Sequence, residues 1–212
     1  LPKSMVILGG GVIGMEWGFI YQTLGVQVHV VEMLPGVLAG VESECADELV
    51  KVLKKAGMRI YTGSKLIRAE PGAAGLTQYI VETKDGEKRI EAERLFMAVG
   101  RRPNLTVNAE KVGIKVERGA IVVDDHCRTS VPGIYAIGDI AGLPQLAHKA
   151  SEEGIVAAEN AMGRDRVFNR NLIPAAIYTS PEVASVGLTE DEAKAQGYDV
   201  KVGKFPFRTL GK

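Results

Sequence analysis

The chain has 212 residues, with 26 basic and 26 acidic side chains and a formal net charge of zero. A chain of this length corresponds to one large domain or two smaller ones. Balanced charge gives no field that attracts nucleic acid or an anionic membrane surface, and the longest apolar runs are too short to cross a bilayer. The composition therefore predicts a globular protein with no nucleic-acid partner and no membrane span.

The two cysteines, Cys45 and Cys127, are too far apart in sequence to form a local redox or zinc motif. We expect two reduced thiols, a cytoplasmic location and no metal site. The opening Leu1-Pro2-Lys3 has neither an initiator methionine nor a signal-peptide pattern, so we expect it to be a cut end.

Strand and helix patterns alternate in the first 61 residues. Apolar residues 5–8 predict a strand that enters a run of three glycines, and a helix is expected from there to Leu24. Residues 26–32 are β-branched and partly alternating, as in a second strand. Early acids and late lysines predict a second helix that ends at Gly57, followed by a third strand at 58–61.

Short strands are predicted from residue 64 to 95, including 78–82 and 88–91, with Asp85-Gly86 as a tight hairpin turn. Residues 95–99 are expected to form another buried strand. The remaining predicted elements are a hairpin-like region at 120–123, an apolar strand at 134–137, a helix from about His148 to Met162, a polar linker at 164–171, a strand starting at 175–178, a short helix capped at Thr189, and a strand up to Phe207.

The first turn carries the sequence Gly9-Gly10-Gly11-Val12-Ile13-Gly14, which satisfies G-x-G-x-x-G. Gly9 permits a tight turn, Gly11 lets the backbone approach a pyrophosphate, and Gly14 allows helix and strand to pack closely. Glu32 ends the second strand, where an acid reaches the adenine ribose hydroxyls. A glycine-rich turn beside an unrelated surface glutamate is the less favoured alternative.

Glu32 also favours NAD over NADP. Its carboxylate would repel a 2′-phosphate, and residues 33–50 contain no basic residue that could bind one. Glu16 lies in the helix that follows the glycines, where complementing the helix dipole is its simplest role.

Five further motifs occur along the chain in a specific order: Val99 to Asn104 (VGRRPN), Gly138-Asp139, Leu146 to Ala150 (LAHKA), Ile177 to Glu182 (IYTSPE) and Val186-Gly187. Together they resemble the class I pyridine nucleotide-disulfide oxidoreductases, and the resemblance covers the whole chain. Within that family the LAHKA stretch is similar to dihydrolipoamide dehydrogenases, whereas glutathione and mercuric reductases differ there.

The resemblance implies an α/β architecture in three parts. A Rossmann-like NAD-binding domain with a parallel sheet, helices and an antiparallel β-meander spans residues 1–117. A second segment of an FAD-binding domain spans 118–170, and the start of an α+β interface, or dimerisation, domain spans 171–212.

The resemblance also implies two cofactors, NAD and FAD. The implied NAD contacts are Gly9, Gly10, Gly11, Val12, Ile13, Gly14, Met15, Glu16, Glu32, Leu66 and Gly100. Asp139 would bind a flavin ribitol hydroxyl, and Gln145, Leu146, Ala147 and His148 would pass beneath the isoalloxazine. From the residues alone, Asp139 is as well explained as a turn aspartate, and His148 as an ordinary residue at a helix N-terminus.

The family's redox-active cysteine pair and its C-terminal His-Glu base have no counterpart in this sequence. We therefore expect no catalytic residue here, and a central piece that is inactive by itself. Its parent is expected to convert dihydrolipoamide and NAD+ to lipoamide and NADH in 2-oxo acid dehydrogenase complexes. The parent would act as a homodimer and bind the lipoyl domain of the acyltransferase component. Its expected location is the cytoplasm or, in a eukaryote, the mitochondrial matrix.

Two alternatives stay open. One is a related NADH-dependent disulfide or peroxide reductase, which the missing cysteine spacing would distinguish. The other is a non-catalytic module that binds a dinucleotide or presents a dimerisation surface.

Overall fold

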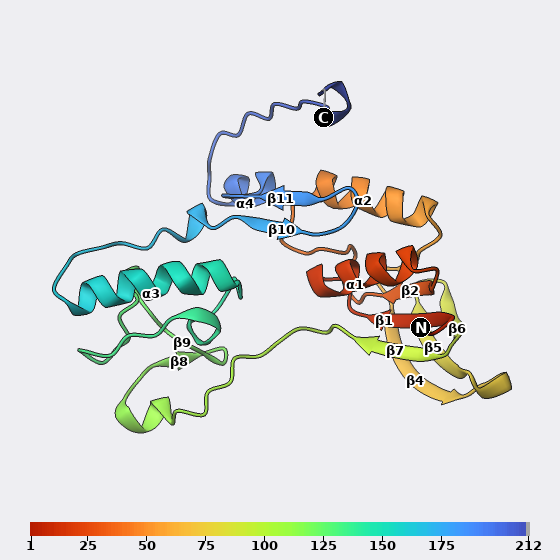
Figure 1. Cartoon of the computed structure of the whole chain (residues 1–212), viewed down its shortest axis with the longest axis horizontal. Coiled ribbons are helices and arrows are strands. Elements are labelled where there is room, and N and C mark those ends of the chain that lie inside the picture. Colours follow the sequence, from red (N-terminus) through yellow and green to blue (C-terminus); the bar gives the residue numbers. More distant parts are fainter. Residues whose placement is uncertain (211–212) are drawn as a thin grey trace. The chain divides into compact units, whose positions relative to one another are not determined.

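The computed structural model describes residues 1–210, which form two compact units (Figure 1). Unit 1 contains residues 1–100 together with the described part of 175–212, and unit 2 contains residues 101–174. Each unit has its own hydrophobic core. Within the described residues, no helix is both long and apolar enough to cross a membrane.

Unit 1 is built on a parallel sheet with the strand order β3-β2-β1-β7. Its strands are β1 (Ser4–Leu8), β2 (Gln27–Val31), β3 (Arg59–Tyr61) and β7 (Arg94–Met97). Helix α1 (Val12–Thr23) connects β1 to β2, and α2 (Ser43–Lys55) connects β2 to β3. The predicted alternation of strands and helices is therefore confirmed, with boundaries shifted by one or two residues.

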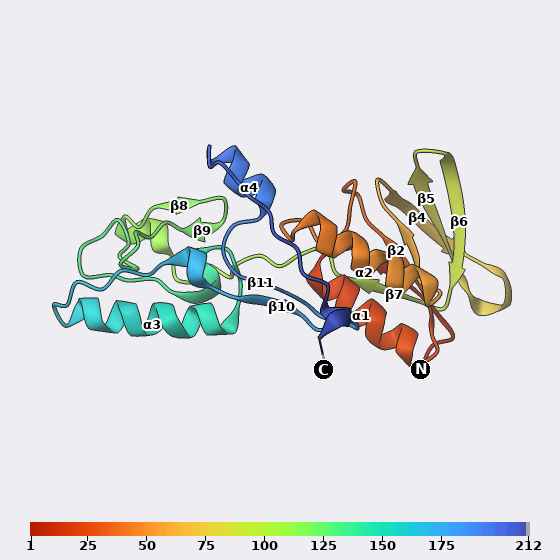
Figure 2. The same ribbon diagram turned by 90° about the horizontal axis from the view of Figure 1, so that it is seen from above.

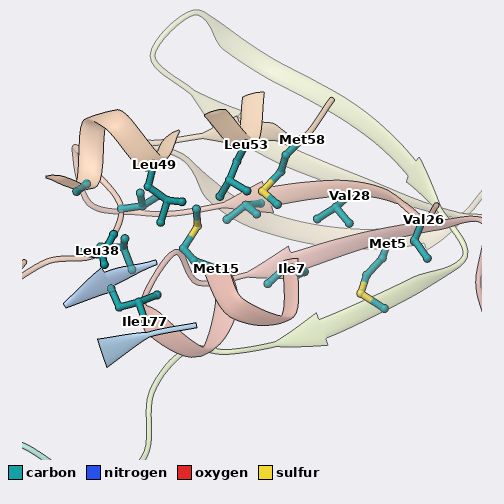
Figure 3. Packing of buried hydrophobic residues seen from close by; sticks show 14 residues of the cluster. Met5, Ile7, Met15, Val26, Val28, Leu38, Leu49, Leu53, Met58 and Ile177 are labelled. Atoms are coloured by element: carbon teal, nitrogen blue, oxygen red, sulfur yellow. The ribbon is translucent and has the colours of Figure 1, made fainter. Parts of the chain in front are cut away.

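The side chains of β1 alternate between the two faces of this sheet. Met5 and Ile7 lie in a core with Met15 of α1 and Leu49 and Leu53 of α2 (Figure 3). Helix α2 presents these residues on one face, with Glu44 in its first turn and lysines in its last turn, where each charge complements the helix dipole. Both helices thus cover one face of the sheet.

An antiparallel sheet covers the opposite face. It consists of β4 (Lys65–Pro71), β5 (Thr77–Thr83) and β6 (Gly86–Ala92), with the short 3-10 helix η1 (Ala73–Gly75) between β4 and β5 (Figure 2). Tyr79, Val81 and Ile90 pack against Val6 and Val31 of the parallel sheet. The predicted meander of short strands is confirmed.

The hairpin between β5 and β6 differs in detail from the prediction. Thr83 pairs with Gly86, so the two loop residues are Lys84 and Asp85 rather than Asp85 and Gly86. Gly86 instead starts β6 with a φ of +107°, a value that glycine adopts without strain.

The segment that starts at Ala175 packs on the face of the parallel sheet that α1 and α2 cover. Strands β10 (Ala175–Ile177) and β11 (Val183–Ser185) form an antiparallel hairpin that adds Ile177 and Val183 to the core around Met15. Helix α4 (Glu190–Ala195) follows. Its start is a complete capping box, in which Thr189 Oγ1 accepts from Glu192 N and Glu192 Oε2 accepts from Thr189 N.

Unit 2 contains a β8–β9 hairpin and one long helix. The hairpin pairs β8 (Val116–Glu117) with β9 (Ala120–Ile121), and the helix is α3 (Ala147–Ala161). Three 3-10 helices complete this unit: η2 (Ala109–Val112), η3 (Gly138–Ala141) and η4 (Arg170–Leu172). Small cores around Ile121 and around Val156 hold these elements together.

Three predicted strands need correction. Residues 95–99 do not form a buried strand, because β7 is the edge of the sheet and Met97 is 65% exposed. Residues 134–137 form only an isolated bridge from Tyr135 to Arg128, since no continuous strand lies beside them. The segment 198–206 is irregular and leads into the 3-10 helix η5 (Phe207–Thr209), because none of the described residues pairs with it as a strand.

Candidate functional site

The glycine turn between β1 and α1 is packed so closely that a Cβ at two of its positions would overlap a backbone oxygen, and a Cβ on Gly10 would lie 2.7 Å from Val37 Cγ1. A Cβ on Gly9 would lie 2.4 Å from the Ala98 carbonyl oxygen, and a Cβ on Gly14 would lie 1.9 Å from the Gly9 carbonyl oxygen. Gly9 also takes a φ of +109°. These two glycines are therefore required by the packing of the turn against Ala98, which follows β7, and of α1 against the turn.

Gly11 differs from both, because a Cβ placed there would meet no atom within 4 Å. The packing of the described residues thus gives no reason for glycine at this position. Open space next to the backbone is what a ligand approaching the main chain requires.

The backbone amides at this point are free to bind an anion. Among the described residues, the amides of Gly11, Val12 and Ile13 have no hydrogen-bond acceptor, and the first bond into α1 runs from Met15 N to Gly11 O at 3.0 Å. The N-terminal end of a helix also carries a positive partial charge. The turn is therefore suited to a phosphate group.

Glu32 lies directly against this turn. Its Oε2 accepts a hydrogen bond from Gly10 N at 2.6 Å, and its Oε1 accepts one from Leu34 N at 2.7 Å. A carboxylate can accept about four hydrogen bonds, so two remain for the hydroxyls of a sugar. The half-buried carboxylate thus holds the glycine turn in place and keeps acceptor capacity for a ligand.

The other predicted NAD residues differ in how close they lie to the carboxyl ends of the strands and in how exposed they are. The amide of Ser64 donates to Glu32 O at 2.8 Å, which brings half-buried Leu66 near the end of β2. Gly100 follows the end of β7 with a φ of +105°. Val12 and Ile13 are partly exposed at the start of α1, whereas Met15 is 0% exposed in the core and offers the site no side chain.

Glu16 lies in the second turn of α1, and the first turn contains no acid. Its Oε1 accepts a hydrogen bond from Tyr178 N at 2.8 Å, at the end of β10. Its contact in the structure is therefore with the end of β10.

The predicted FAD residues all lie in unit 2, on η3 and at the start of α3. Asp139 is exposed on η3, and its carboxylate has no hydrogen-bond or ion-pair partner among the described residues. Leu146 is the N-cap of α3, Gln145 and Leu146 are half-buried, and Ala147 and His148 are exposed. His148 Nε2 lies 2.7 Å from the Pro174 carbonyl oxygen, so its ring has a protein partner here.

One feature of unit 2 was not anticipated from the sequence. Lys149 and Glu153 form an ion pair of 3.1 Å with both side chains 0% exposed, and the pair contacts the turn that carries Asp139. The signal that would have revealed it is the four-residue spacing of opposite charges on the helix that follows the Gly-Asp motif.

Two side chains outside these sites have strongly shifted pKa values. Burial, and then the charges of Arg59 and Lys88, lower the pKa of His29 to about 4. Burial, and then Glu153, raise the pKa of the Cys127 thiol to about 11. Both cysteines are free, Cys45 being exposed and Cys127 buried.

The strand order and the position of the glycine turn define the Rossmann type of α/β fold. The turn lies at the carboxyl end of β1, which has β2 on one side and β7 on the other. In open α/β sheets, ligands bind at the carboxyl ends of the strands, at the point where the strand order reverses. The chain belongs to the pyridine nucleotide-disulphide oxidoreductase family, whose model matches residues 1–154. Residues 173–212 match the dimerisation domain of the same family.

Curated relatives agree with this assignment. The chain is 45% identical over 215 residues to a dihydrolipoyl dehydrogenase of Thermus scotoductus, which covers 100% of this chain and 46% of the relative. It is 43% identical to the dihydrolipoyl dehydrogenase of Bacillus subtilis, covering 100% of this chain and 45% of the relative. The chain thus spans about half the length of the curated relatives it matches.

Two solved structures are similar to almost the whole chain. LpdA from Mycobacterium tuberculosis aligns with a TM-score of 0.85 at 31% identity, covering 99% of this chain and 45% of that one. The HOCl-induced flavoprotein disulfide reductase RclA from Escherichia coli aligns with a TM-score of 0.85 at 26% identity, covering 100% of this chain and 48% of that one.

Proposed function

We propose that this chain carries the NAD(H) site and part of the FAD site of a dihydrolipoamide-oxidising flavoprotein. The observation that carries the proposal is the pairing of acceptor-free amides at Gly11, Val12 and Ile13 with the carboxylate of Glu32 beside them. A dinucleotide offers the matching groups, an anionic pyrophosphate and a ribose diol. The relatives named dihydrolipoyl dehydrogenase support the choice of substrate.

In this proposal each part of the turn has one task. Gly11 leaves room for the pyrophosphate, the amides at the start of α1 donate to it, and Glu32 accepts from the ribose hydroxyls. Because a 2′-phosphate would meet the negative charge of Glu32, NAD is preferred over NADP. Leu66, Gly100 and Glu16 are proposed to complete the site.

Unit 2 fits a flavin at Asp139. The exposed carboxylate there has no partner among residues 1–210, so it is free to accept from a ribityl hydroxyl. Residues 145–148 are proposed to lie under the ring system. When bound, the flavin would pass electrons between a dithiol and the nicotinamide, and this chain's residues would orient it for that transfer.

The activity proposed for the whole protein is the conversion of dihydrolipoamide and NAD+ to lipoamide, NADH and a proton. Homodimer formation is supported by the dimerisation-domain match at 173–212, and a lipoyl domain is the proposed partner. The domain boundaries at 117/118 and 170/171 and the cytoplasmic location stay predictions. A different disulfide reductase is the second candidate, which the similarity to RclA favours.

A matched set of glycine variants tests the nucleotide site. Trp17, the one tryptophan, lies next to Glu16 on α1, so its emission should be quenched when NADH binds nearby. Gly11→Ala should fold with an unchanged melting temperature and bind NADH at least tenfold more weakly. Gly14→Ala should lower the melting temperature, because its Cβ would overlap the Gly9 carbonyl.

Gly203→Ala is the control, since a Cβ there also meets open space but lies outside the turn. Its NADH titration should match that of the unsubstituted chain. If Gly11→Ala binds NADH as tightly as Gly203→Ala does, the turn is not the pyrophosphate site and the proposal fails.

A further inference from the structure

The buried charges of α3 contact both ends of the turn that displays Asp139. Lys149 Nζ donates to the carbonyl oxygens of Gly138 at 3.1 Å and Gly142 at 3.0 Å, and it lies 3.1 Å from Glu153 Oε2. The three acceptors match the three N–H donors of an ammonium group. Lys149 is therefore fully satisfied by this turn and its own helix.

Glu153 holds the same turn through the opposite backbone group. Its Oε2 accepts from Gly138 N at 2.7 Å, so both the amide and the carbonyl of Gly138 are bound by the ion pair. Gly138 has a φ of +74°, and a Cβ there would lie 3.4 Å from Ala150 Cβ. The 3-10 turn η3 thus rests on α3 at Gly138, one residue before Asp139.

The pair is not explained by stability alone. Removing two charges from water is costly, and buried ion pairs can often be replaced by apolar side chains without loss of stability. Glu153 Oε1 is buried without a hydrogen-bond partner, and Arg170 Nη1 lies 3.8 Å from it, beyond hydrogen-bond distance. A carboxylate left incompletely bonded in this way indicates that its position serves the turn rather than the core.

We propose that Lys149 and Glu153 are positioning residues that hold η3 in place before the flavin binds, so that Asp139 presents its carboxylate to a ribityl hydroxyl. The inference rests on the proposed FAD site at Asp139. Neither residue touches the flavin in this proposal, because both side chains are enclosed beneath the turn. A preformed turn lowers the entropic cost of binding the cofactor.

The test uses the full-length flavoprotein, its flavin-free form, and the double variant Lys149→Met with Glu153→Leu. This variant leaves no unpaired buried charge, but the Gly138 amide and the Gly138 and Gly142 carbonyls lose their partners. Its flavin-free form should therefore still fold, with a lower melting temperature than the wild type. Its dissociation constant for FAD should rise at least tenfold, and amide hydrogen exchange across 138–142 should become at least tenfold faster. The circular dichroism of the bound flavin should also change.

The control replaces the exposed ion pair of the same spacing on α4, by Lys194→Met with Glu190→Leu. It should leave FAD affinity and exchange at 138–142 unchanged. Asp139→Asn separates the two proposals. If Asp139→Asn loses FAD affinity while the Lys149/Glu153 double variant binds FAD as the wild type does, the positioning role is overturned and the FAD site stands.

If Asp139→Asn binds FAD as the wild type does, the proposed FAD site at Asp139 is wrong, and the positioning role falls with it. Should the double variant fail to fold, hydrogen exchange on the wild type decides. Slow exchange across 138–142 in the flavin-free protein supports a preformed turn. Fast exchange that slows only after FAD is added overturns the proposal.

Discussion

The carboxylate of Glu32 accepts a hydrogen bond from the amide of Gly10 at 2.6 Å, across 22 positions of sequence. The acid at the end of β2 therefore binds the glycine turn that follows β1. Its second oxygen accepts from Leu34 N at 2.7 Å. The same side chain that is proposed to bind the ribose also organises the backbone that is proposed to bind the pyrophosphate.

Glu32→Gln should weaken NADH binding about 10- to 100-fold, because hydrogen bonds to a charged group contribute roughly 1.5–3 kcal/mol and the new amide turns N–H groups toward backbone donors. The preference for NADH over NADPH should also fall, since the charge that repels a 2′-phosphate is gone. Calorimetric titration with both nucleotides measures the two effects. Glu48→Gln, which removes a charge from an exposed pair with Lys51, is the control and should change neither. Unchanged NADH affinity in Glu32→Gln would contradict the proposed ribose contact.

His29 should make the stability of unit 1 depend on pH in a defined range. Its pKa is about 4 in the folded chain, below the ordinary histidine value of 6.5, so the unfolded chain binds the extra proton first as pH falls. The contribution of neutral His29 to the free energy of unfolding is complete above pH 6.5 and is lost as pH falls toward 4. Its maximum is about 3 kcal/mol. Chemical denaturation between pH 7.5 and 4.5 should show a smaller loss of stability in His29→Gln than in the wild type. Equal losses in both proteins would show that His29 is not the group responsible.

The two thiols should react at very different rates. Cys45 is exposed on α2, whereas Cys127 is buried and its pKa is raised to about 11, so little thiolate forms at neutral pH. With a chromogenic disulfide reagent at pH 8, one thiol per chain should react quickly, and the second only after denaturant is added. In Cys45→Ser the fast phase should disappear. Two fast thiols would mean that Cys127 is accessible in solution.

The capping box of α4 should be detectable by a single substitution. Thr189→Ala removes the acceptor for Glu192 N and should weaken the helix by about 1 kcal/mol, whereas Thr189→Ser keeps the hydroxyl. Because α4 has no buried residue, the effect should be confined to faster amide exchange over 190–195. Equal exchange in the alanine and serine variants would argue against the cap.

Local patterns in the sequence were sufficient for the order of strands and helices over residues 1–61 and for the glycine turn. Strand and helix periodicity follows from which side chains must face a core, and G-x-G-x-x-G followed by Glu32 at the end of the second strand is a local requirement of the backbone. The Thr189 cap was likewise readable, since its partners lie within three residues.

Only the tertiary structure decided which glycines are needed for packing and which is open to a ligand. Gly9, Gly11 and Gly14 are the same residue type, but a Cβ on Gly9 would meet Ala98 beyond the end of β7, a Cβ on Gly14 would meet Gly9, and a Cβ on Gly11 would meet no atom within 4 Å. The exposure of β7, the bond from Tyr178 to Glu16 and the buried Lys149–Glu153 pair depend on contacts between distant segments. Hydrophobic periodicity indicates that a side chain is buried. Which residue it contacts depends on the tertiary structure, because the partner comes from a distant segment of the chain.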